Sequence, residues 1–304
     1  RKIELDNDDE RKIELDNDDE RKIEPDNDDE NKRKIEPDNV DEKEKILILQ
    51  KYLININEYE KGEKIGKGGT SIVYEATKIN QESIKHAAKV FLLKSYDYEK
   101  IMRDVAREVE YQVKLTHLLI PKFIGYSSVS FDQCENPLTM TELLKNGSLY
   151  DAVKRLSEGK EIPELNDKKI LDIIINIAKA MDYLHSEKII HRDLKLENIL
   201  LDESFNPKLS DFGLSMKDSE EPDDFGTVGT GPYIAPEIWS DNKYSKASDV
   251  YAFGILVYEL VTKKIAFKGQ KDYIIMRMIA YAKERPPLDD QVSAFYRELI
   301  ESCW

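Results

Sequence analysis

The densest group of residues able to do chemistry is the stretch HRDLKLEN at residues 191–198. Its Asp193 carboxylate can accept the proton of a reacting hydroxyl, and the ammonium of Lys195 can steady a neighbouring anion. Asn198 adds an amide, and a second carboxylate, Asp211, follows in Asp-Phe-Gly. These side chains suit the movement of a phosphoryl group, which needs positioned phosphates, neutralised charge and an oriented nucleophile.

A glycine-rich segment, IGKGGTSIV at residues 65–73, lies upstream of that stretch. Gly66 and Gly68 have no Cβ atom, so backbone N–H groups there can approach phosphate oxygens without a collision. Lys89, in HAAK, supplies a point charge for phosphates, and pairing with Glu108 would hold its flexible stem. Taken singly, the glycines are a weak signal, Lys89 is an ordinary surface lysine and Glu108 is an exposed helical charge.

The order of these motifs resembles that of the protein kinase family. The glycine-rich loop, HAAK, Glu108, HRDLKLEN, DFG and Ala235-Pro236-Glu237 follow one another as in that family, from about Tyr59 to Trp304. The resemblance implies an α+β, bilobal kinase fold with a small β-rich N-lobe and a mainly helical C-lobe. It also implies ATP and Mg²⁺ as cofactors.

The same resemblance assigns roles to individual residues. Asp193, Lys195 and Asn198 would be catalytic, and Asn198 and Asp211 would hold Mg²⁺ as hard oxygen ligands. Thr141 would be the gatekeeper of the adenine pocket. The residues expected to bind ATP are Ile65, Gly66, Gly68, Val73, Ala87, Lys89, Glu108, Thr141, Glu142, Leu144 and Leu200.

Part of this set would form the adenine pocket itself. Glu142 and Leu144, in MTELLKNGSL, would contact adenine through their backbone. Val73, Ala87 and Leu200 would enclose the ring with apolar surface. Taken separately, these are unremarkable core residues.

Two positions depart from the family pattern, and two others are expected to be supports. Ser71 stands where a third glycine is usual, at the most replaceable position of that loop. Gln112 stands where the family usually has an apolar residue, so its amide is expected to loosen the active arrangement of the helix that carries Glu108. By resemblance, His191 would pack against the DFG phenylalanine, and Asp249 would hold the backbone of the catalytic loop.

The substrate hydroxyl is inferred from the motifs around the catalytic loop. Lys195 in HRDLK, with Thr230 and Tyr233 in GTGPYIAPE, resembles serine/threonine kinases. The hinge, the stretch SDVYAFGILVYELVT and the terminal CW resemble the tyrosine-kinase-like group of those enzymes. The sequence therefore indicates a signalling kinase that transfers the γ-phosphate of ATP to protein Ser or Thr. The alternative is a pseudokinase, a scaffold that binds partners without turnover.

The segment between Asp211 and Glu237 resembles a regulatory activation loop. Arg192 precedes the catalytic aspartate and could pair with a phosphate, for which Ser219 and Thr227 are the candidate sites. Thr230 is instead expected to contact the catalytic aspartate and lysine. The loop also carries five acidic side chains: Asp218, Glu220, Glu221, Asp223 and Asp224. A solvated charge run is the plain interpretation, and the alternative is that one of them partly replaces the phosphate opposite Arg192.

Regular elements must position these residues, and the spacing of apolar residues predicts several. Short β-branched runs predict strands over Glu63–Ala76 and His86–Leu93, and helical spacing marks Asp104–Leu115. Apolar residues at intervals of three and four predict a helix over Leu171–Leu184. Val250–Thr262 is apolar nearly all round, which predicts a helix buried at the centre of a lobe.

Three regions are expected along the chain: an acidic tail at 1–45, the N-lobe and hinge at 46–145, and the C-lobe at 146–304. The tail repeats RKIELDNDDE with two basic and five acidic residues per copy. One Ile and at most one Leu per copy bury too little apolar area to offset the entropy of ordering, so disorder is expected. A solvated tail is the plain interpretation, and a segment that docks on a basic partner is the alternative.

The overall composition excludes some classes of partner. The net charge of −15 and the isoelectric point of about 4.9 argue against nucleic acid. No apolar run approaches the length of a membrane span. Two cysteines are too few for a disulfide framework, which favours a reducing compartment and a cytoplasmic location.

The end of the sequence also carries an expectation. In the family, CW leads to a final helix whose arginine pairs with the glutamate of APE. Glu237 would lose that partner, and an unpaired buried carboxylate costs about 3–5 kcal/mol. The C-lobe is therefore expected to be incomplete and the 304-residue chain to be poorly stable.

We predict that deleting the repeats at residues 1–40 leaves catalysis intact, because their composition cannot join a core. Turnover on a peptide should stay within about twofold and the unfolding midpoint should hardly change. A large loss of activity would mean that the tail docks on the folded domain.

Overall fold

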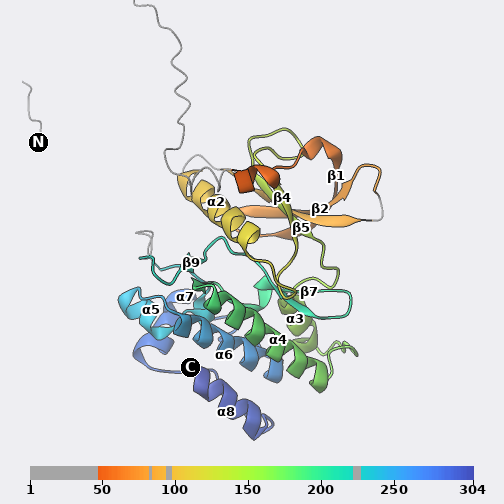
Figure 1. Cartoon of the computed structure of the whole chain (residues 1–304). Helices are drawn as coiled ribbons and strands as arrows, with labels where there is room; N and C mark the ends of the chain where they lie inside the picture. The colour runs from red at the N-terminus through yellow and green to blue at the C-terminus, as the bar shows by residue number, and fades with distance from the viewer. Residues whose placement is uncertain (1–46, 82–83, 94–97, 222–226) are drawn as a thin grey trace, which may run out of the picture.

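The computed structural model describes residues 47–81, 84–93, 98–221 and 227–304, so the predicted acidic tail lies outside the described residues. The described chain forms two lobes, a small one built on an antiparallel sheet and a larger one built from helices (Figure 1). This arrangement confirms the predicted α+β, bilobal architecture. No helix among the described residues is long and apolar enough to cross a membrane.

The N-lobe is a five-stranded sheet in the order β1-β2-β3-β5-β4, with one long helix packed beside it. Every pair of neighbouring strands is antiparallel. A helical turn at residues 47–51 precedes the sheet. The bounds of the elements are η1 (Ile56–Glu58), β1 (Tyr59–Lys67), β2 (Ser71–Lys78), β3 (Lys85–Phe91), α2 (Tyr98–Lys114), β4 (Phe123–Ser127) and β5 (Leu138–Glu142).

The predicted strand over Glu63–Ala76 is wrong, because the structure has a hairpin there. Strands β1 and β2 pair up to Lys67 and Ile72, and the chain turns between them. The backbone N–H of Gly68 donates to the carbonyl of Ser71 at 2.8 Å, which closes the turn. The glycines that seemed to interrupt one strand are therefore the connection between two.

Helix α2 begins at Tyr98, six residues before the predicted start at Asp104. The prediction started too late because the first turn of the helix carries few apolar residues. Six of its residues are buried, and all except Tyr111 recur at intervals of three and four and form one face toward the sheet: Ile101, Val105, Glu108, Val109 and Gln112. Two residues of this face, Glu108 and Gln112, are polar, so the face carries chemistry as well as packing.

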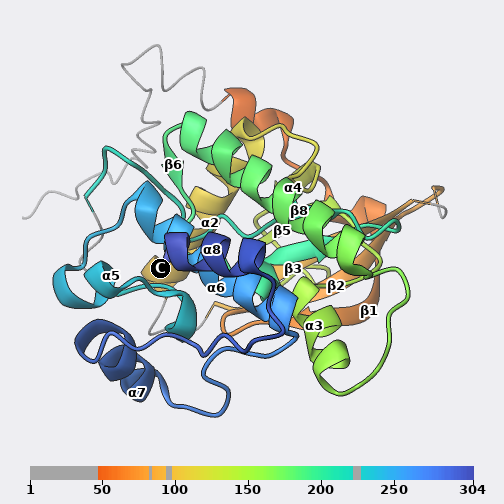
Figure 2. The same cartoon turned by 90° about the horizontal axis from the view of Figure 1, so that it is seen from below.

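The C-lobe is organised around α6, as its apolar sequence predicts. Twelve residues of this helix are buried, on all sides of its axis. Helix α8 packs against α6, and a Cβ atom on Gly254 would come within 2.7 Å of Cys303 Cβ, so glycine allows this close approach (Figure 2). The helices and 3-10 turns of this lobe are α3 (Leu149–Ser157), α4 (Asp167–Ser186), η2 (Leu196–Asn198), η3 (Gly231–Tyr233), α5 (Pro236–Asp241), α6 (Lys246–Thr262), α7 (Asp272–Met276) and α8 (Ala294–Cys303), with a π-helical turn η4 (Arg277–Tyr281).

The C-lobe also contains short strands. Helix α4, predicted from Leu171–Leu184, starts after an Asn166 cap whose side chain accepts from the Lys169 N–H at 3.0 Å. It ends next to the first of two small sheets, in which β6 pairs with β9 and β7 with β8. These strands are β6 (Ile189–Ile190), β7 (Ile199–Leu201), β8 (Pro207–Leu209) and β9 (Met216–Lys217).

Glu237 lies at the start of α5 and is half-buried. Within the part of the chain that the structure describes, no residue makes an ion pair with its carboxylate. The low stability that we expect from an unpaired Glu237 stays a prediction.

We predict that Gln112→Met stabilises the protein. Gln112 is only 5% exposed, and its Oε1 atom has no hydrogen-bond partner among the described residues. Removing an unsatisfied buried amide while keeping an unbranched chain of similar length should raise the free energy of unfolding by about 1–3 kcal/mol. Denaturant unfolding measures this change, and the exposed Gln291→Met is the matched control. A lower stability for Gln112→Met would show that the amide has a partner in solution.

Candidate active site

Helix α6 fixes the backbone of the loop that carries the candidate catalytic residues. Asp249, in the first turn of that helix, is 2% exposed and accepts from the backbone N–H groups of His191 and Arg192 at 2.9 and 3.0 Å. His185 Nε2 lies 2.9 Å from the same carboxylate. A buried carboxylate is tolerated when such hydrogen bonds replace its water. Asp249 thus lies where the sequence placed a support for the loop backbone.

The Asp-Phe-Gly segment is fixed to this loop by His191. The rings of His191 and Phe212 meet edge to face with centroids 5.5 Å apart, and Phe212 is completely buried. His191 Nε2 lies 3.1 Å from the carbonyl oxygen of Ser210. The expected packing of His191 on the DFG phenylalanine is present, and it sets the place of Asp211.

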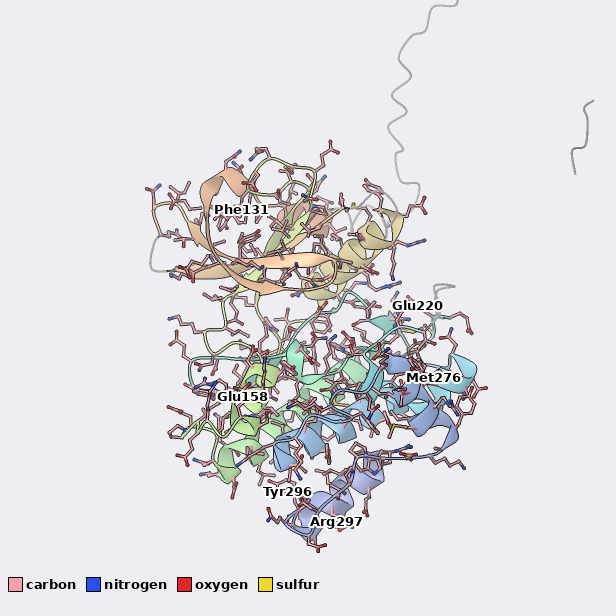
Figure 3. All side chains as sticks on the ribbon, turned by 180° about the vertical axis from the view of Figure 1, so that it is seen from behind. Phe131, Glu158, Glu220, Met276, Tyr296 and Arg297 are labelled. Atoms are coloured by element: carbon pink, nitrogen blue, oxygen red, sulfur yellow. The ribbon has the colours of Figure 1, made fainter. Side chains whose placement is uncertain are left out.

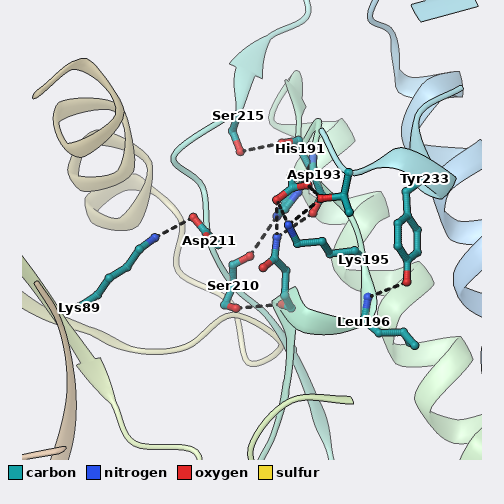
Figure 4. A network of polar contacts seen from close by, with 11 residues as sticks. Lys89, His191, Asp193, Lys195, Leu196, Ser210, Asp211, Ser215 and Tyr233 are labelled. Atoms are coloured by element: carbon teal, nitrogen blue, oxygen red, sulfur yellow. Dashed lines mark hydrogen bonds and ion pairs between the residues drawn. The ribbon is translucent and has the colours of Figure 1, made fainter. Parts of the chain in front are cut away.

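Asp193 lies at the centre of a network of short hydrogen bonds (Figure 4). Lys195 Nζ donates to its Oδ2 at 2.6 Å, and Asn198 Nδ2 donates to the same oxygen at 3.0 Å. Thr230 donates to Oδ1 at 2.9 Å and accepts from Lys195 at 2.9 Å. The expected contacts of Thr230 with Asp193 and Lys195 are therefore present, Asn198 joins them, and the carboxylate is held in one orientation.

Lys89 connects the two lobes through a second network. Its Nζ atom lies 2.7 Å from Glu108 Oε2, on α2. The same atom lies 2.9 Å from Asp211 Oδ1, in the C-lobe (Figure 4). Thr139, on β5, donates to the other Glu108 oxygen at 3.0 Å. The predicted pairing of Lys89 with Glu108 is present, and Asp211 adds a second carboxylate.

Burial and charge act against each other in this network. Burial alone would lower the pKa of Lys89, but the carboxylates of Asp211 and Glu108 outweigh it and raise that pKa. Burial raises the pKa of Glu108, and Lys89 offsets this only in part. For Asp211 the attraction of Lys89 prevails over burial and lowers the pKa. Lys89 therefore stays a cation at neutral pH.

A cavity of about 240 Å³ lies between the lobes beside this network. Its lining includes Gly68, Val73, Ala87, Lys89, Glu108, Thr141 and Leu200 of the predicted ATP set, together with Asn198 and Asp211. Four predicted residues do not line it: Ile65, Gly66, Glu142 and Leu144. Their nucleotide contacts stay predictions.

Those four residues have other surroundings. Ile65 is 48% exposed on β1, and Gly66 pairs with Val73 in the hairpin. The Glu142 carboxylate binds Lys208 Nζ at 2.5 Å, and the backbone N–H of Glu142 donates to Lys122 O at 2.9 Å. Leu144 is buried.

The oxygen atoms on the cavity wall suit Mg²⁺. Both Asn198 hydrogen bonds to Asp193 use Nδ2, so its Oδ1 is available as a ligand. The Asp211 carboxylate is 40% exposed at its side chain and directs only Oδ1 to Lys89. Mg²⁺ in nucleotide sites is commonly bound by one or two protein oxygens together with substrate phosphates, so the residues present fit this ion.

Sequence reasoning missed several residues of the cavity wall, and among them Thr139 contacts a predicted site residue. It is 2% exposed, lines the cavity and holds Glu108 in place. Thr139 and Thr141 are two residues apart on β5, so they share a face of the sheet. That alternation was the available signal.

The predicted regulatory residues lie around the segment after Asp211. Ser219 and Thr227 are exposed. Arg192 is buried, its Nε donates to the carbonyl of Leu214, and its guanidinium lies 5.1 Å from the ring centroid of Tyr244. The residue is therefore already engaged by its surroundings.

The acidic side chains of this segment have different positions. Asp218 lies 3.4 Å from Lys246, and Glu220 binds Lys217. Figure 3 places Glu220 at the edge of the molecule, near the boundary between the lobes. Asp223 and Asp224 lie outside the described residues.

The comparison with known proteins agrees with this geometry. The chain is similar to "Probable serine/threonine-protein kinase drkC" of Dictyostelium discoideum, with 32% identity over 83% of this chain and 33% of that protein. It is 29% identical to "Serine/threonine/tyrosine-protein kinase HT1" of Arabidopsis thaliana, over 80% of this chain and 60% of that protein. It is 30% identical to "Dual specificity protein kinase splA" of Dictyostelium discoideum, over 84% of this chain and 11% of that protein.

The matching region thus covers between about a tenth and three fifths of these relatives. Residues 59–304 match the family model described as protein kinase domain, which takes in both lobes and every motif described above. The chain belongs to the protein kinase family.

Proposed function

We propose that this protein is an ATP- and Mg²⁺-dependent serine/threonine kinase that acts in signalling by transferring the γ-phosphate of ATP to protein hydroxyls. The observation that carries the proposal is the double network around Asp193 and Lys89. One network orients a carboxylate, and the other fixes a cation at the wall of the cavity between the lobes. Phosphoryl transfer needs mainly such positioning and charge stabilisation.

The nucleotide would lie in the cavity with its phosphates toward Lys89. The β1–β2 turn would lie over the phosphates, and Val73, Ala87 and Leu200, which line the cavity, would enclose the adenine. Asn198 and Asp211 would hold Mg²⁺, which would neutralise phosphate charge when bound.

Asp193 would bind and orient the attacking hydroxyl. Its carboxylate accepts the hydroxyl proton as the substrate oxygen forms its bond to the γ-phosphorus, and the bond from that phosphorus to the bridging oxygen of ADP breaks. Lys195, 2.6 Å from Asp193, is placed to steady the transferring phosphoryl group.

The preference for Ser and Thr is supported by the contact between Lys195 and Thr230. These two residues carry the serine/threonine pattern in the sequence, and the printed names of the relatives span serine/threonine, serine/threonine/tyrosine and dual-specificity kinases. Membership of the tyrosine-kinase-like group rests on the hinge, the α6 sequence and the terminal CW, and stays part of the proposal.

The wider setting is proposed on composition. Protein substrates are the partners, the acidic tail is available to a basic partner, and the two free cysteines favour the cytoplasm. The net charge of −15 does not suit nucleic acid.

We predict that Asp193→Asn and Lys89→Met each lower phosphate transfer by several powers of ten, because each removes a charge at the reacting groups. The measurement is transfer of labelled phosphate from ATP to a generic basic protein, with circular dichroism to verify folding. Matched controls are the exposed Asp132→Asn and Lys145→Met, which should keep full turnover. Binding of MgATP by the wild type without any transfer would favour a scaffold instead.

We also predict that Thr227 or Ser219 becomes phosphorylated and that Thr227→Ala lowers activity, because a phosphate on this segment could pair with Arg192. Mass spectrometry of protein incubated with MgATP locates the modification, and activity of Thr227→Ala and Ser219→Ala measures its effect. An unmodified segment in a fully active protein would remove phosphorylation from this account.

A further inference from the structure

Residues 47–54 precede the region that matches the kinase family, yet they pack on the N-lobe as part of its structure. We call this segment the amino-terminal strap. The backbone N–H of Ile54 donates to Tyr126 O at 2.9 Å, and the N–H of Tyr126 donates to Tyr52 O at 2.9 Å. Leu53 thereby pairs in parallel with Tyr126, on β4, which is the edge strand of the sheet. The strap therefore covers an edge that would otherwise be open.

Gly125 is shaped for this contact. A Cβ atom at that position would lie 2.4 Å from Ile54 Cγ2 and 2.5 Å from the carbonyl oxygen of Tyr52. Real Cβ atoms do not approach other atoms so closely, and one of the two neighbours is rigid backbone. Any other residue at 125 would displace the strap from β4.

Side chains of the strap reach the apolar layer between α2 and the sheet. Leu49 and Tyr52 pack against a buried cluster that α2, β3 and β4 share, and the Tyr52 ring lies 5.5 Å from the ring of Phe123. The helical turn at 47–51 lies beside one end of α2 (Figure 1). The cluster consists of Phe91, Ile101, Val105, Val109 and Phe123.

Three of those five residues belong to the face of α2 that also carries Glu108. Val105 and Glu108 are one turn apart on that face, and Val109 follows directly. A segment that covers this cluster therefore bears on the position of Glu108, which must reach Lys89 at 2.7 Å.

We propose that the strap positions α2 for phosphoryl transfer, with Tyr52 as a positioning residue that acts through the Lys89–Glu108 pair. The inference rests on the proposed kinase function. Without the Tyr52 ring, α2 loses apolar cover, and the population of molecules in which Glu108 meets Lys89 falls. Tyr52 touches neither nucleotide nor substrate, so its effect reaches the site only through α2.

The test uses point variants of the full chain. Tyr52→Ala should lower kcat by about 2- to 30-fold, the range of couplings carried by packed networks. Tyr52→Phe keeps the ring and should restore turnover. Leu53→Ala is the matched control, since its side chain belongs to the same segment but is 56% exposed. Gly125→Ala should reproduce the loss by displacing the strap without removing a side chain.

Hydrogen exchange gives a readout that does not need turnover. In Tyr52→Ala, backbone amides of α2 should exchange faster while those of α6 keep their protection. Equal acceleration in both helices would reduce the effect to general destabilisation and overturn the proposal, as would wild-type kcat together with wild-type exchange of α2. If the wild-type protein transfers no phosphate, the proposed function fails, and the exchange pattern alone decides on the strap.

Discussion

The ammonium group of Lys89 lies between two carboxylates that come from different parts of the fold. Glu108 is brought by α2 and Asp211 by the C-lobe, at 2.7 and 2.9 Å. In a poorly solvated site such attraction is strong, and removing one partner leaves a charge uncompensated at a cost of several kcal/mol. The position of α2, the register of β3 and the place of the DFG segment must all be correct at once for this contact to form. The proposed nucleotide site therefore depends on the joint arrangement of both lobes.

In the C-lobe, buried contacts hold the DFG segment, and with it Asp211, in place. Asp249, on the all-round buried α6, bonds two backbone N–H groups of the catalytic loop, and His191 in that loop packs on Phe212 beside Asp211. A chain of contacts thus runs from the core of the C-lobe through Asp211 to the ammonium group of Lys89. In the N-lobe, α2 has only one face against the sheet, and that face contains the unsatisfied amide of Gln112. We therefore regard α2 as less firmly packed than the C-lobe part of the site, and the amino-terminal strap as the support of this helix.

Sequence predicted those features that depend on local pattern or on a fixed motif. The apolar run of α6, the spacing of α4 and the contact of Thr230 with Asp193 and Lys195 are of this kind. The β1–β2 hairpin was misjudged because glycines interrupt and connect strands with the same local signal. Thr139 was missed because its hydrogen bond to Glu108 depends on how α2 packs against β5. The strap lies outside every motif, and its packing depends on Gly125, 71 residues after Ile54 in the chain.

A double-mutant cycle on the equilibrium affinity for MgATP tests most directly the claim that Glu108 serves nucleotide binding through Lys89. The cycle compares the wild type with Glu108→Gln, Lys89→Met and the double variant. If Glu108 acts by holding Lys89, each single variant binds MgATP more weakly, and adding Glu108→Gln to Lys89→Met weakens binding no further. Losses that simply add in the double variant would contradict the account, because Glu108 would then affect the nucleotide independently of Lys89.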